Sequence, residues 1–471
     1  MIEHKNNYVD GQWIPSMSTD VLTVTNPVTE EPIATVPRGV AEDVNKAAEA
    51  AAKAFPAWSQ TPVEERAAFF RKLARLTEKR SEEITNTMVT ELGYPITLCR
   101  KSQVEGAVEE LDLIAEVLGE IQWSEQIGST TVKRVPSGVL GAITAWNGPL
   151  RSIISKAGAA IGAGCTTVLK PSEVAPLTAY IFAEMCDEVG LPAGVFNMVS
   201  GTGPEVGEAI VSHPLIDMVS LTGSVRAGRR VMELASEGVK RVHLELGGKS
   251  ANIIFEDVDF ENAVRDGIED ATRNAGQACG ALTRMLVPRA RLADAEALAK
   301  TTAEALVIGD PFDPKTTLGP LSTRAAHDRV RNYINVGMQE GLRLVTGGPD
   351  MPEGRNSGYY VRPTIFSGNN SSRLAQEEIF GPVIIIIPFD DEEDAIRIAN
   401  DSSYGLAGAV WSADKDRAYR VADRLRTGRV RVNGGALDKR GVHGGFKLSG
   451  VGREWGRVGV EEFLEYRAVY S

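Results

Sequence analysis

The sequence predicts an α/β fold in which mostly parallel sheets are covered by helices, and three observations carry this prediction. From Gly138 onward, short apolar runs alternate with segments of helix length, and a second alternation of the same kind follows Gly247. Such alternation is typical of βαβ units, which place helices on both faces of a parallel sheet. At 471 residues the chain is also too long for one ordinary core, and about 150 residues per domain predicts two to four domains.

The composition is that of a soluble globular protein. Hydrophobic residues make up 43% and charged residues 24% of the chain, so neither a disordered nor a fibrous class is favoured. The net charge is −12 and no run is dense in Lys and Arg, which argues against nucleic acid or an anionic membrane surface as a partner. We therefore expect a small-molecule substrate.

No segment predicts a membrane span or a secretory signal. The longest apolar run in the C-terminal half, Val383–Phe389, is far shorter than the roughly 18 residues that a spanning helix needs, and it predicts a buried strand. The first residues, Met1–Asn7, have no basic region followed by an apolar stretch, so we expect a cytoplasmic protein.

The cysteines and histidines are scattered along the chain. This spacing favours reduced thiols over a disulfide framework or a zinc site, and no metal site is predicted. The four cysteines are Cys99, Cys165, Cys186 and Cys279.

The N-terminal part is expected to be helical scaffold. Residues 42–54 and 62–92 repeat apolar positions every three or four residues, which predicts two long amphipathic helices. A hairpin is predicted over residues 121–135, with its turn at Gly128 and Ser129.

The later apolar runs predict the strands of two sheets. In the first alternation the runs are Val139–Thr144, Thr166–Leu169, Val195–Val199 and Met218–Leu221. In the second alternation they are Asn252–Phe255, Met285–Val287, Val383–Ile387 and Arg429–Val432. The first sheet should bind a nucleotide at the carboxyl ends of its strands.

Glu245 and Cys279 suggest a nucleophile and its base. A thiol with a pKa of about 8.5 is mostly protonated at neutral pH, so attack on a carbonyl needs a nearby proton acceptor. Gly247 and Gly248 let the backbone pass close to a ligand or another strand. Taken alone, most cysteines are small buried hydrophobes and most glutamates are solvated surface charges.

Two glycine-rich loops are candidates for binding phosphate. Gly203 and Gly207 lie where a predicted strand leads into a helix, but Pro204 at the first helical turn fits plain helix initiation equally well. Gly223 and Ser224 also lie between a strand and a helix, where free backbone N–H groups would face an anion. The second loop is the stronger candidate for a pyrophosphate site.

Lys170 and Glu173 directly follow a predicted strand, where a doubly wound sheet places its ligand crevice. The alternative interpretation is a surface ion pair. A carboxylate at Glu173 can accept hydrogen bonds from ribose hydroxyls and would repel a 2′-phosphate.

Four ordered segments together resemble the aldehyde dehydrogenase superfamily: Thr144–Leu150, Val168–Glu173, His243–Lys249 and Asn274–Gly280. The resemblance runs from Tyr8–Trp13 to Gly450–Glu454. It implies a Rossmann-like NAD-binding domain of residues 1–118 and 137–246 and a catalytic α/β domain of residues 247–447. Residues 119–136 and 448–471 would form an oligomerisation flap and C-terminal tail, in which 459–471 pair with the hairpin in a homodimer or homotetramer.

The resemblance also assigns roles to single residues. Cys279 would be the nucleophile, Glu245 the base that activates water, and Asn147 a donor to the oxyanion together with the Cys279 N–H. The cofactor residues implied are Trp146, Lys170, Glu173, Gly203, Gly207, Gly223, Ser224, Glu378 and Phe380. NAD is favoured over NADP, although Lys170 or Arg226 could compensate the charge of a 2′-phosphate.

The reaction expected is oxidation of an aldehyde to the free acid. Relatives that pass the acyl group to coenzyme A generally lack the glutamate that stands here as Glu245. The alternative is a CoA-acylating or esterase-like thiol enzyme. A binding protein without activity is disfavoured because Asn147, Glu245 and Cys279 are all present. Lys156 and Glu454 match positions linked with proton traffic, but plain ion pairs would explain them equally well.

Departures from the common pattern predict a wide substrate pocket. Gly148 stands where many relatives carry an aromatic residue, and Val442–Lys447 replaces a segment that usually begins with proline and an aromatic. Arg151, Ser152 and Ser155 follow instead of large apolar residues. We expect a bulky or functionalised aldehyde, whose distal carboxylate Arg151 could meet, unless a neighbouring side chain fills the space.

Overall fold

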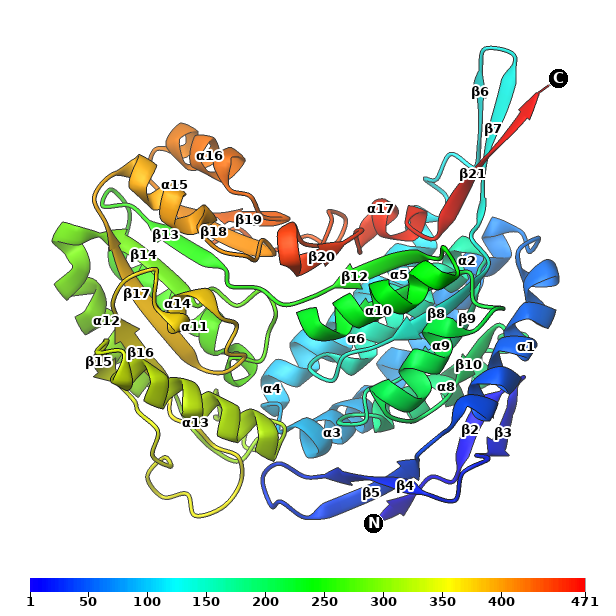
Figure 1. Ribbon diagram of the computed structural model, residues 1–471, viewed down its shortest axis with the longest axis horizontal. Coiled ribbons are helices and arrows are strands. Elements are labelled where there is room, and N and C mark those ends of the chain that lie inside the picture. The colour runs from blue at the N-terminus through cyan, green and yellow to red at the C-terminus, as the bar shows by residue number, and fades with distance from the viewer. Residues whose placement is uncertain (471) are drawn as a thin grey trace.

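The computed structural model describes residues 1–470 and consists of two α/β domains with a small sheet that projects from one of them (Figure 1). The α/β class expected from the alternating apolar runs is therefore confirmed. None of the helices in residues 1–470 combines the length and the apolar character needed to span a bilayer.

The first domain is built on an eight-stranded sheet with the order β20-β12-β11-β8-β9-β10-β2-β3. Its strands are β2 (Asn6–Val9), β3 (Gln12–Pro15), β8 (Val139–Ile143), β9 (Thr166–Lys170), β10 (Phe196–Met198), β11 (Met218–Thr222), β12 (Arg241–Glu245) and β20 (Gly450–Val451). The five strands from β12 to β10 are parallel. The strand order reverses between β8 and β11, which is where such a sheet opens a ligand crevice.

Helices cover both faces of this sheet. They are α1 (Ala41–Trp58), α2 (Val63–Lys79), α3 (Ser81–Leu92), α4 (Ile96–Cys99), α5 (Gly106–Val117), α6 (Pro149–Ile153), α7 (Ala159–Ala163), α8 (Leu177–Glu188), α9 (Glu208–Ser212), α10 (Val225–Glu237) and α17 (Gly456–Glu461). A short sheet of β1 (Ile2–Glu3), β5 (Pro32–Pro37) and β4 (Val21–Thr25) lies beside them.

The long helix predicted over residues 62–92 is wrong, because the segment forms two helices that meet at Arg80. The backbone of Arg80 leaves the helical region, with φ −93° and ψ 15°. Its guanidinium donates to Glu83 and Glu184, each over 2.7 Å, so the side chain ties α3 to α8 at the break. The apolar repeat continues through the junction, which is why periodicity alone did not reveal it.

The second domain has a seven-stranded sheet with the order β15-β16-β17-β14-β13-β18-β19, parallel except for β15. Its strands are β13 (Ala251–Ile254), β14 (Arg284–Pro288), β15 (Arg343–Thr346), β16 (Thr364–Ser367), β17 (Val383–Phe389), β18 (Ala407–Trp411) and β19 (Arg429–Val432). The helices are α11 (Phe260–Thr272), α12 (Leu292–Glu304), α13 (Arg324–Gln339), α14 (Arg373–Gln376), α15 (Glu392–Asn400) and α16 (Lys415–Arg424).

The predicted hairpin is present as β6 (Ser124–Ile127) and β7 (Thr130–Pro136), and it extends away from the body of the molecule (Figure 1). The last strand, β21 (Leu464–Tyr470), pairs antiparallel with β7 along its whole length. The expected pairing of hairpin and tail is therefore confirmed. Residues 448–471 also contribute β20 to the edge of the first sheet, next to β12.

Candidate active site

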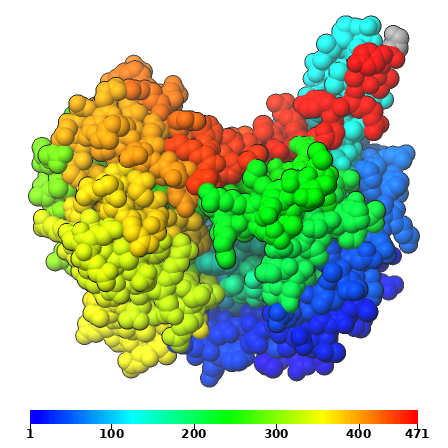
Figure 2. Space-filling view, in the orientation of Figure 1, coloured from blue at the N-terminus to red at the C-terminus, as the bar shows by residue number. Residues whose placement is uncertain are grey.

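The three predicted catalytic residues lie where the two domains meet. Glu245 is the last residue of β12, and Asn147 lies between β8 and α6, so both stand at the carboxyl edge of the first sheet. Cys279 precedes β14, at the amino edge of the second sheet. Figure 2 shows the surface hollowed between the green part of the first domain and the yellow and orange second domain.

Gly247 and Gly248 bring the two domains into close contact. A Cβ atom at Gly248 would lie 2.5 Å from the carbonyl oxygen of Cys279, and one at Gly247 would lie 2.1 Å from the Glu378 carboxylate. Because no side chain fits at either position, these glycines allow the segment after Glu245 to pack directly on the segment that carries Cys279.

The loop before Cys279 is held in an unusual backbone conformation. Asn274, Ala275 and Gly276 have φ values of 52°, 53° and 71°, which non-glycine residues rarely adopt. Gln277 fixes the turn, since its N–H donates to the Asn274 carbonyl over 3.0 Å and its Oε1 accepts from the Ser322 N–H over 2.9 Å. Strain of this kind is typical of functional loops.

Asn147 is tied to the same loop. Its Nδ2 donates to the Gln277 carbonyl over 3.0 Å, two residues before Cys279. An amide nitrogen carries two N–H groups, so this bond fixes the side chain and leaves one donor for a ligand.

Cys279 is the one cysteine of the four that is not fully buried. Burial of the sulfur nevertheless raises the pKa of the Cys279 thiol to about 11, and Glu245 acts in the same direction while Arg429 opposes them. The thiol is therefore protonated at neutral pH and needs a base to become a nucleophile.

Glu245 is a buried carboxyl group without a hydrogen-bond partner on either oxygen among residues 1–470. Burial raises its pKa well above the ordinary value, Glu454 adds to this effect, and Lys156 opposes it. A base with a raised pKa is suited to general acid and base work near neutral pH.

A chain of buried polar groups leads away from Glu245. The Glu245 Oε1 lies 3.5 Å from the His243 Nε2. The other ring nitrogen of His243, Nδ1, lies 2.7 Å from the Ser220 Oγ. Lys156 donates to Ser220 over 3.1 Å and to Glu454 over 2.7 Å. The Lys156–Glu454 ion pair left open by the sequence is thus present, inside the protein rather than on its surface.

The sequence analysis missed Ser220 and His243. The available signal was a polar residue between two apolar residues of a strand: Val219 and Leu221 flank Ser220, and Val242 and Leu244 flank His243. Both polar side chains are completely buried. Buried polar groups must find partners, so such positions point to a network.

Lys170 and Glu173 form an ion pair of 2.9 Å at the carboxyl end of β9. Burial lowers the pKa of Lys170. For Glu173, burial acts to raise the pKa, but the adjacent Lys170 outweighs it and holds the pKa below the ordinary value. Glu173 is therefore ionised. Gly207 lies beside the Lys170 side chain, since a Cβ atom at Gly207 would be 3.7 Å from the Lys170 Cδ.

The second glycine-rich loop opens a long helix. Ser224 is the N-cap of α10, where its Oγ accepts from the Ala227 N–H over 3.2 Å. Gly223 precedes it at the end of β11, next to the reversal in strand order. Gly203 begins a π-helical turn capped by Thr202 and has open space where a side chain would stand.

Trp146, Glu378 and Phe380 converge from the two domains. The rings of Trp146 and Phe380 are 5.5 Å apart and nearly perpendicular, at 84°. Phe380 has a φ of 61°, a strained value for an aromatic residue. The Glu378 Oε1 accepts from the Gly248 N–H over 3.0 Å, which places this carboxylate beside the segment that follows Glu245.

The predicted pocket cation Arg151 is already paired. Its Nε lies 3.5 Å from the Glu110 carboxylate. A Cβ atom at Gly148 would lie 3.2 Å from the side-chain amide of Gln103. Gln103 therefore fills part of the space that the glycine leaves.

Arg429 is a cation that stands beside the reactive loop. Its Nη2 would lie 2.4 Å from a Cβ at Gly280, and its guanidinium is 5.7 Å from the ring of Trp455. Burial lowers its pKa, and no carboxylate within residues 1–470 forms an ion pair with it.

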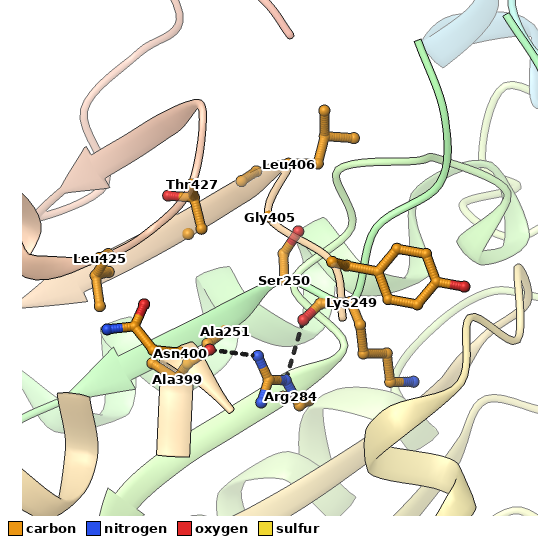
Figure 3. Close-up of a pocket in the computed structure, with 13 residues that line it drawn as sticks. Lys249, Ser250, Ala251, Arg284, Ala399, Asn400, Gly405, Leu406, Leu425 and Thr427 are labelled. Carbon is orange, nitrogen blue, oxygen red and sulfur yellow. Dashed lines mark hydrogen bonds between the residues drawn. The ribbon is translucent and has the colours of Figure 1, made fainter. Parts of the chain in front are cut away.

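A small pocket behind the Glu245 segment is structural. Figure 3 shows Arg284 within it, donating to the carbonyl oxygens of Lys249 and Ala399 over 3.0 and 2.8 Å. These bonds fix the chain directly after Gly247 and Gly248. The pocket therefore supports the segment that follows Glu245.

Comparison with known proteins gives a consistent picture. A model described as "Aldehyde dehydrogenase family" matches residues 13–469. A 3-succinoylsemialdehyde-pyridine dehydrogenase from a Pseudomonas species is 45% identical, over 100% of this chain and 99% of the relative.

Two solved structures are similar to the whole chain. An aldehyde dehydrogenase from Pseudomonas syringae, with one cysteine replaced by alanine and in complex with NAD⁺ and octanal, has a TM-score of 0.98 at 46% identity, covering 99% of this chain and 96% of that one. A Mycobacterium tuberculosis aldehyde dehydrogenase complexed with NAD⁺ has a TM-score of 0.97 at 42% identity, covering 100% and 98%.

Proposed function

The chain belongs to the aldehyde dehydrogenase family, and we propose that it oxidises an aldehyde to the free acid with NAD⁺ through a covalent adduct on Cys279. The observation that carries the proposal is the meeting of Cys279, Glu245 and Asn147 at facing edges of the two sheets. The cysteine-to-alanine change in a relative that holds octanal supports the same choice of nucleophile.

The first half of the reaction forms the adduct. Glu245 accepts the thiol proton, and the Cys279 sulfur bonds to the carbonyl carbon of the aldehyde. The oxygen becomes an oxyanion that the free N–H of Asn147 and the backbone N–H of Cys279 stabilise. Bound NAD⁺ supplies the acceptor for the hydride that the adduct loses as it becomes a thioester.

The second half releases the acid. Glu245, deprotonated again, takes a proton from water while the water oxygen bonds to the thioester carbon. The carbon–sulfur bond then breaks, the sulfur leaves as a thiolate, and the carboxylic acid departs. Acyl transfer to coenzyme A is the alternative reaction. The presence of Glu245 favours hydrolysis over this transfer.

The residues proposed to hold the cofactor fit NAD⁺. The ionised Glu173 suits two ribose hydroxyls and would repel a 2′-phosphate. The free N–H groups at the start of α10, after Gly223 and Ser224, suit a pyrophosphate. The rings of Trp146 and Phe380 pack edge to face, and Glu378 stands two positions before Phe380, so the nicotinamide ring is proposed to bind beside these residues. Two similar structures hold NAD⁺.

The substrate is proposed to be a bulky or functionalised aldehyde. Support comes from a relative named for a pyridine-bearing semialdehyde and from one that binds octanal. Arg151 is paired with Glu110, so Arg429, which lies beside Gly280, is the arginine proposed to contact a polar group of the substrate. An arginine in that position suits a carbonyl or carboxylate oxygen on the substrate.

The projecting sheet of β6, β7 and β21 is proposed to join copies of the chain in a homodimer or homotetramer. Its outer strands have unpaired edges within residues 1–470, and exposed side chains such as Tyr466, Val469 and Tyr470 lie along β21. Unpaired edges and exposed apolar groups favour association.

The decisive experiment is a panel of alkyl, aromatic and keto- or carboxy-substituted aldehydes, each with NAD⁺ and with NADP⁺, followed by nicotinamide reduction. We expect the wild type to turn over with NAD⁺ and coenzyme A not to stimulate it. We expect Cys279→Ala to show no turnover. Full activity of Cys279→Ala, or turnover that requires coenzyme A, would contradict the proposal. A higher kcat/KM for acetaldehyde than for every larger aldehyde would contradict the substrate class alone.

A further inference from the structure

Glu245 lies between two imidazole rings that come from different parts of the chain. The His243 Nε2 is 3.5 Å from Oε1, and the His443 Nε2 is 3.4 Å from Oε2. Neither contact is a hydrogen bond, and both carboxylate oxygens and the His243 Nε2 are buried without a partner among residues 1–470. An unsatisfied donor and acceptor this close together are poised to bond, because a movement of about half an ångström is sufficient.

The polar chain behind His243 determines which of its ring nitrogens carries the proton. The Lys156 ammonium can only donate, so the Ser220 Oγ accepts from it over 3.1 Å. The Ser220 hydroxyl proton is then free to donate to the His243 Nδ1 over 2.7 Å. Burial lowers the pKa of His243 well below its ordinary value, so the ring is neutral and its remaining proton is on Nε2, the atom that faces Glu245.

His443 lacks such an arrangement. Its ring stacks on Trp455 with centroids 4.6 Å apart, and its Nδ1 is buried without a partner among the described residues. Apart from Glu245 itself, no hydrogen-bond partner among residues 1–470 selects its tautomer. The two histidines therefore stand at nearly equal distances from Glu245 but differ in whether a donor is fixed towards it.

We propose that His243 is a positioning residue that holds the Glu245 carboxylate through its Nε2–H while the acyl group on Cys279 is hydrolysed. The inference rests on the proposed function, since it concerns the water-activating step. Ser220 and Lys156 act behind His243 by keeping the proton on Nε2. The proton that Glu245 takes from water stays on Glu245 in this step, so no further acceptor is needed.

A donor that bonds the charged form of a carboxyl group lowers its pKa. Removing the His243 N–H therefore raises the pKa of Glu245, and the acidic limb of hydrolysis moves to higher pH because the carboxylate is the active form. The other titratable or charged groups that face Glu245 remain in each variant: Cys279, Arg429, His443, Arg453, Glu454 and Lys156.

The test isolates hydrolysis from oxidation. Enzyme with saturating NAD⁺ is acetylated by p-nitrophenyl acetate, and loss of the acetyl group from Cys279 is followed by mass spectrometry across the pH range in which the protein stays folded. His243→Leu removes the donor. His243→Gln keeps an N–H at the end of a side chain of similar reach, and His443→Leu is the matched control at nearly the same distance from Glu245.

We expect His243→Leu to move the acidic limb up by about one pH unit and to slow hydrolysis about tenfold below it. His243→Gln and His443→Leu should keep the wild-type limb. The proposal is overturned if His243→Leu has the wild-type limb, or if His243→Gln shifts as far as His243→Leu. If His243→Leu does not fold, Ser220→Ala decides: a limb unchanged from wild type contradicts the proposal, and an upward shift supports it. Failure to acetylate Cys279 in the wild type would contradict the proposed function instead.

Discussion

At the residue scale, the nucleophile and its base share one physical condition. Burial raises the pKa of both Cys279 and Glu245, so each favours its neutral, protonated form. A thiol in this state reacts slowly with oxidants and alkylating agents, because the thiolate is the reactive form. The site is thus inert until a substrate arrives, and Glu245 must be ionised in the fraction of molecules that react.

This condition predicts the pH dependence of thiol alkylation. In enzyme without substrate, the rate of Cys279 modification by iodoacetamide should rise throughout the accessible alkaline range, since the thiol titrates with a pKa of about 11. The measurement is loss of activity together with the mass of the modified Cys279 peptide. A rate that reaches its plateau near neutral pH would show that the free site already holds a thiolate.

Arg429 predicts a change in substrate preference. Arg429→Met should lower kcat/KM for keto- or carboxy-substituted aldehydes about tenfold relative to unbranched alkanals, because a charge-assisted hydrogen bond is lost. Arg426→Met is the matched control, since Arg426 is exposed three residues away. Equal losses for both substrate classes would instead assign Arg429 to the chemistry common to all aldehydes.

At the scale of elements, the site depends on two segments without regular structure. The left-handed turn at Asn274–Gly276 presents Cys279, and the glycine pair at 247 and 248 lets the end of β12 reach it. Each segment is followed by a strand of the second sheet, β14 or β13, which anchors it. The first residues of β13 and β14 therefore fix the positions of the two segments that bring the reacting groups together.

Gly248→Ala should abolish most activity while the protein still folds. The added methyl would meet the Cys279 carbonyl at 2.5 Å, so the nucleophile loop must move. A displacement of about 1 Å is expected to reduce kcat about 100-fold. Gly119→Ala is the control, because its methyl meets only an ordinary contact at 3.4 Å. Near-normal kcat for Gly248→Ala, with unchanged circular dichroism in both variants, would contradict this account.

The strands differ in how clearly their sequences predict them. Apolar runs of β-branched residues identified strands such as β17, and all eight predicted strands are present with ends displaced by at most two residues. The strand β18 was missed because Ala407–Trp411 is rich in Ala and Gly, which have low strand propensity. Its formation depends on pairing with β13 and β19, which only the folded structure provides.

The same limit applies to the candidate site. Motifs identified Cys279, Glu245 and Asn147 as a group, whereas the partners of Arg151 and the chain from His243 to Glu454 depend on contacts between distant segments. Lys156 and Glu454 are 298 positions apart. Spacing along the chain contains no information about such a pair, and the assignments of single cofactor residues stay predictions.

At the scale of the whole molecule, the projecting sheet of β6, β7 and β21 is separate from the chemistry. It extends from the first domain (Figure 1). Its exposed side chains include Ile127, Tyr466 and Tyr470. Arg134 lies over the ring of Tyr466 at 5.2 Å, which stiffens the pairing of β7 with β21. A rigid strand edge of this kind is suited to pairing with another copy.

Val469→Lys should weaken self-association, because a charge on an edge strand opposes pairing with a further strand. The measurement is molar mass by light scattering during size-exclusion chromatography over a dilution series. We expect dissociation at about tenfold higher protein concentration than for the wild type. Tyr419→Lys is the control, an exposed aromatic on α16 in the other domain. If both variants dissociate at the same protein concentration, the projecting sheet is not part of the interface between copies.

The position of β20 beside β12 has a consequence for synthesis. On the ribosome, Cys279 emerges long before His443, Glu454 and the β20 strand that complete the surroundings of Glu245. A nascent chain therefore carries both Cys279 and Glu245 before the strand that packs beside β12 has been made. The surroundings of Glu245 are complete only when this last segment folds back, so we expect a chain that ends before His443 to be inactive.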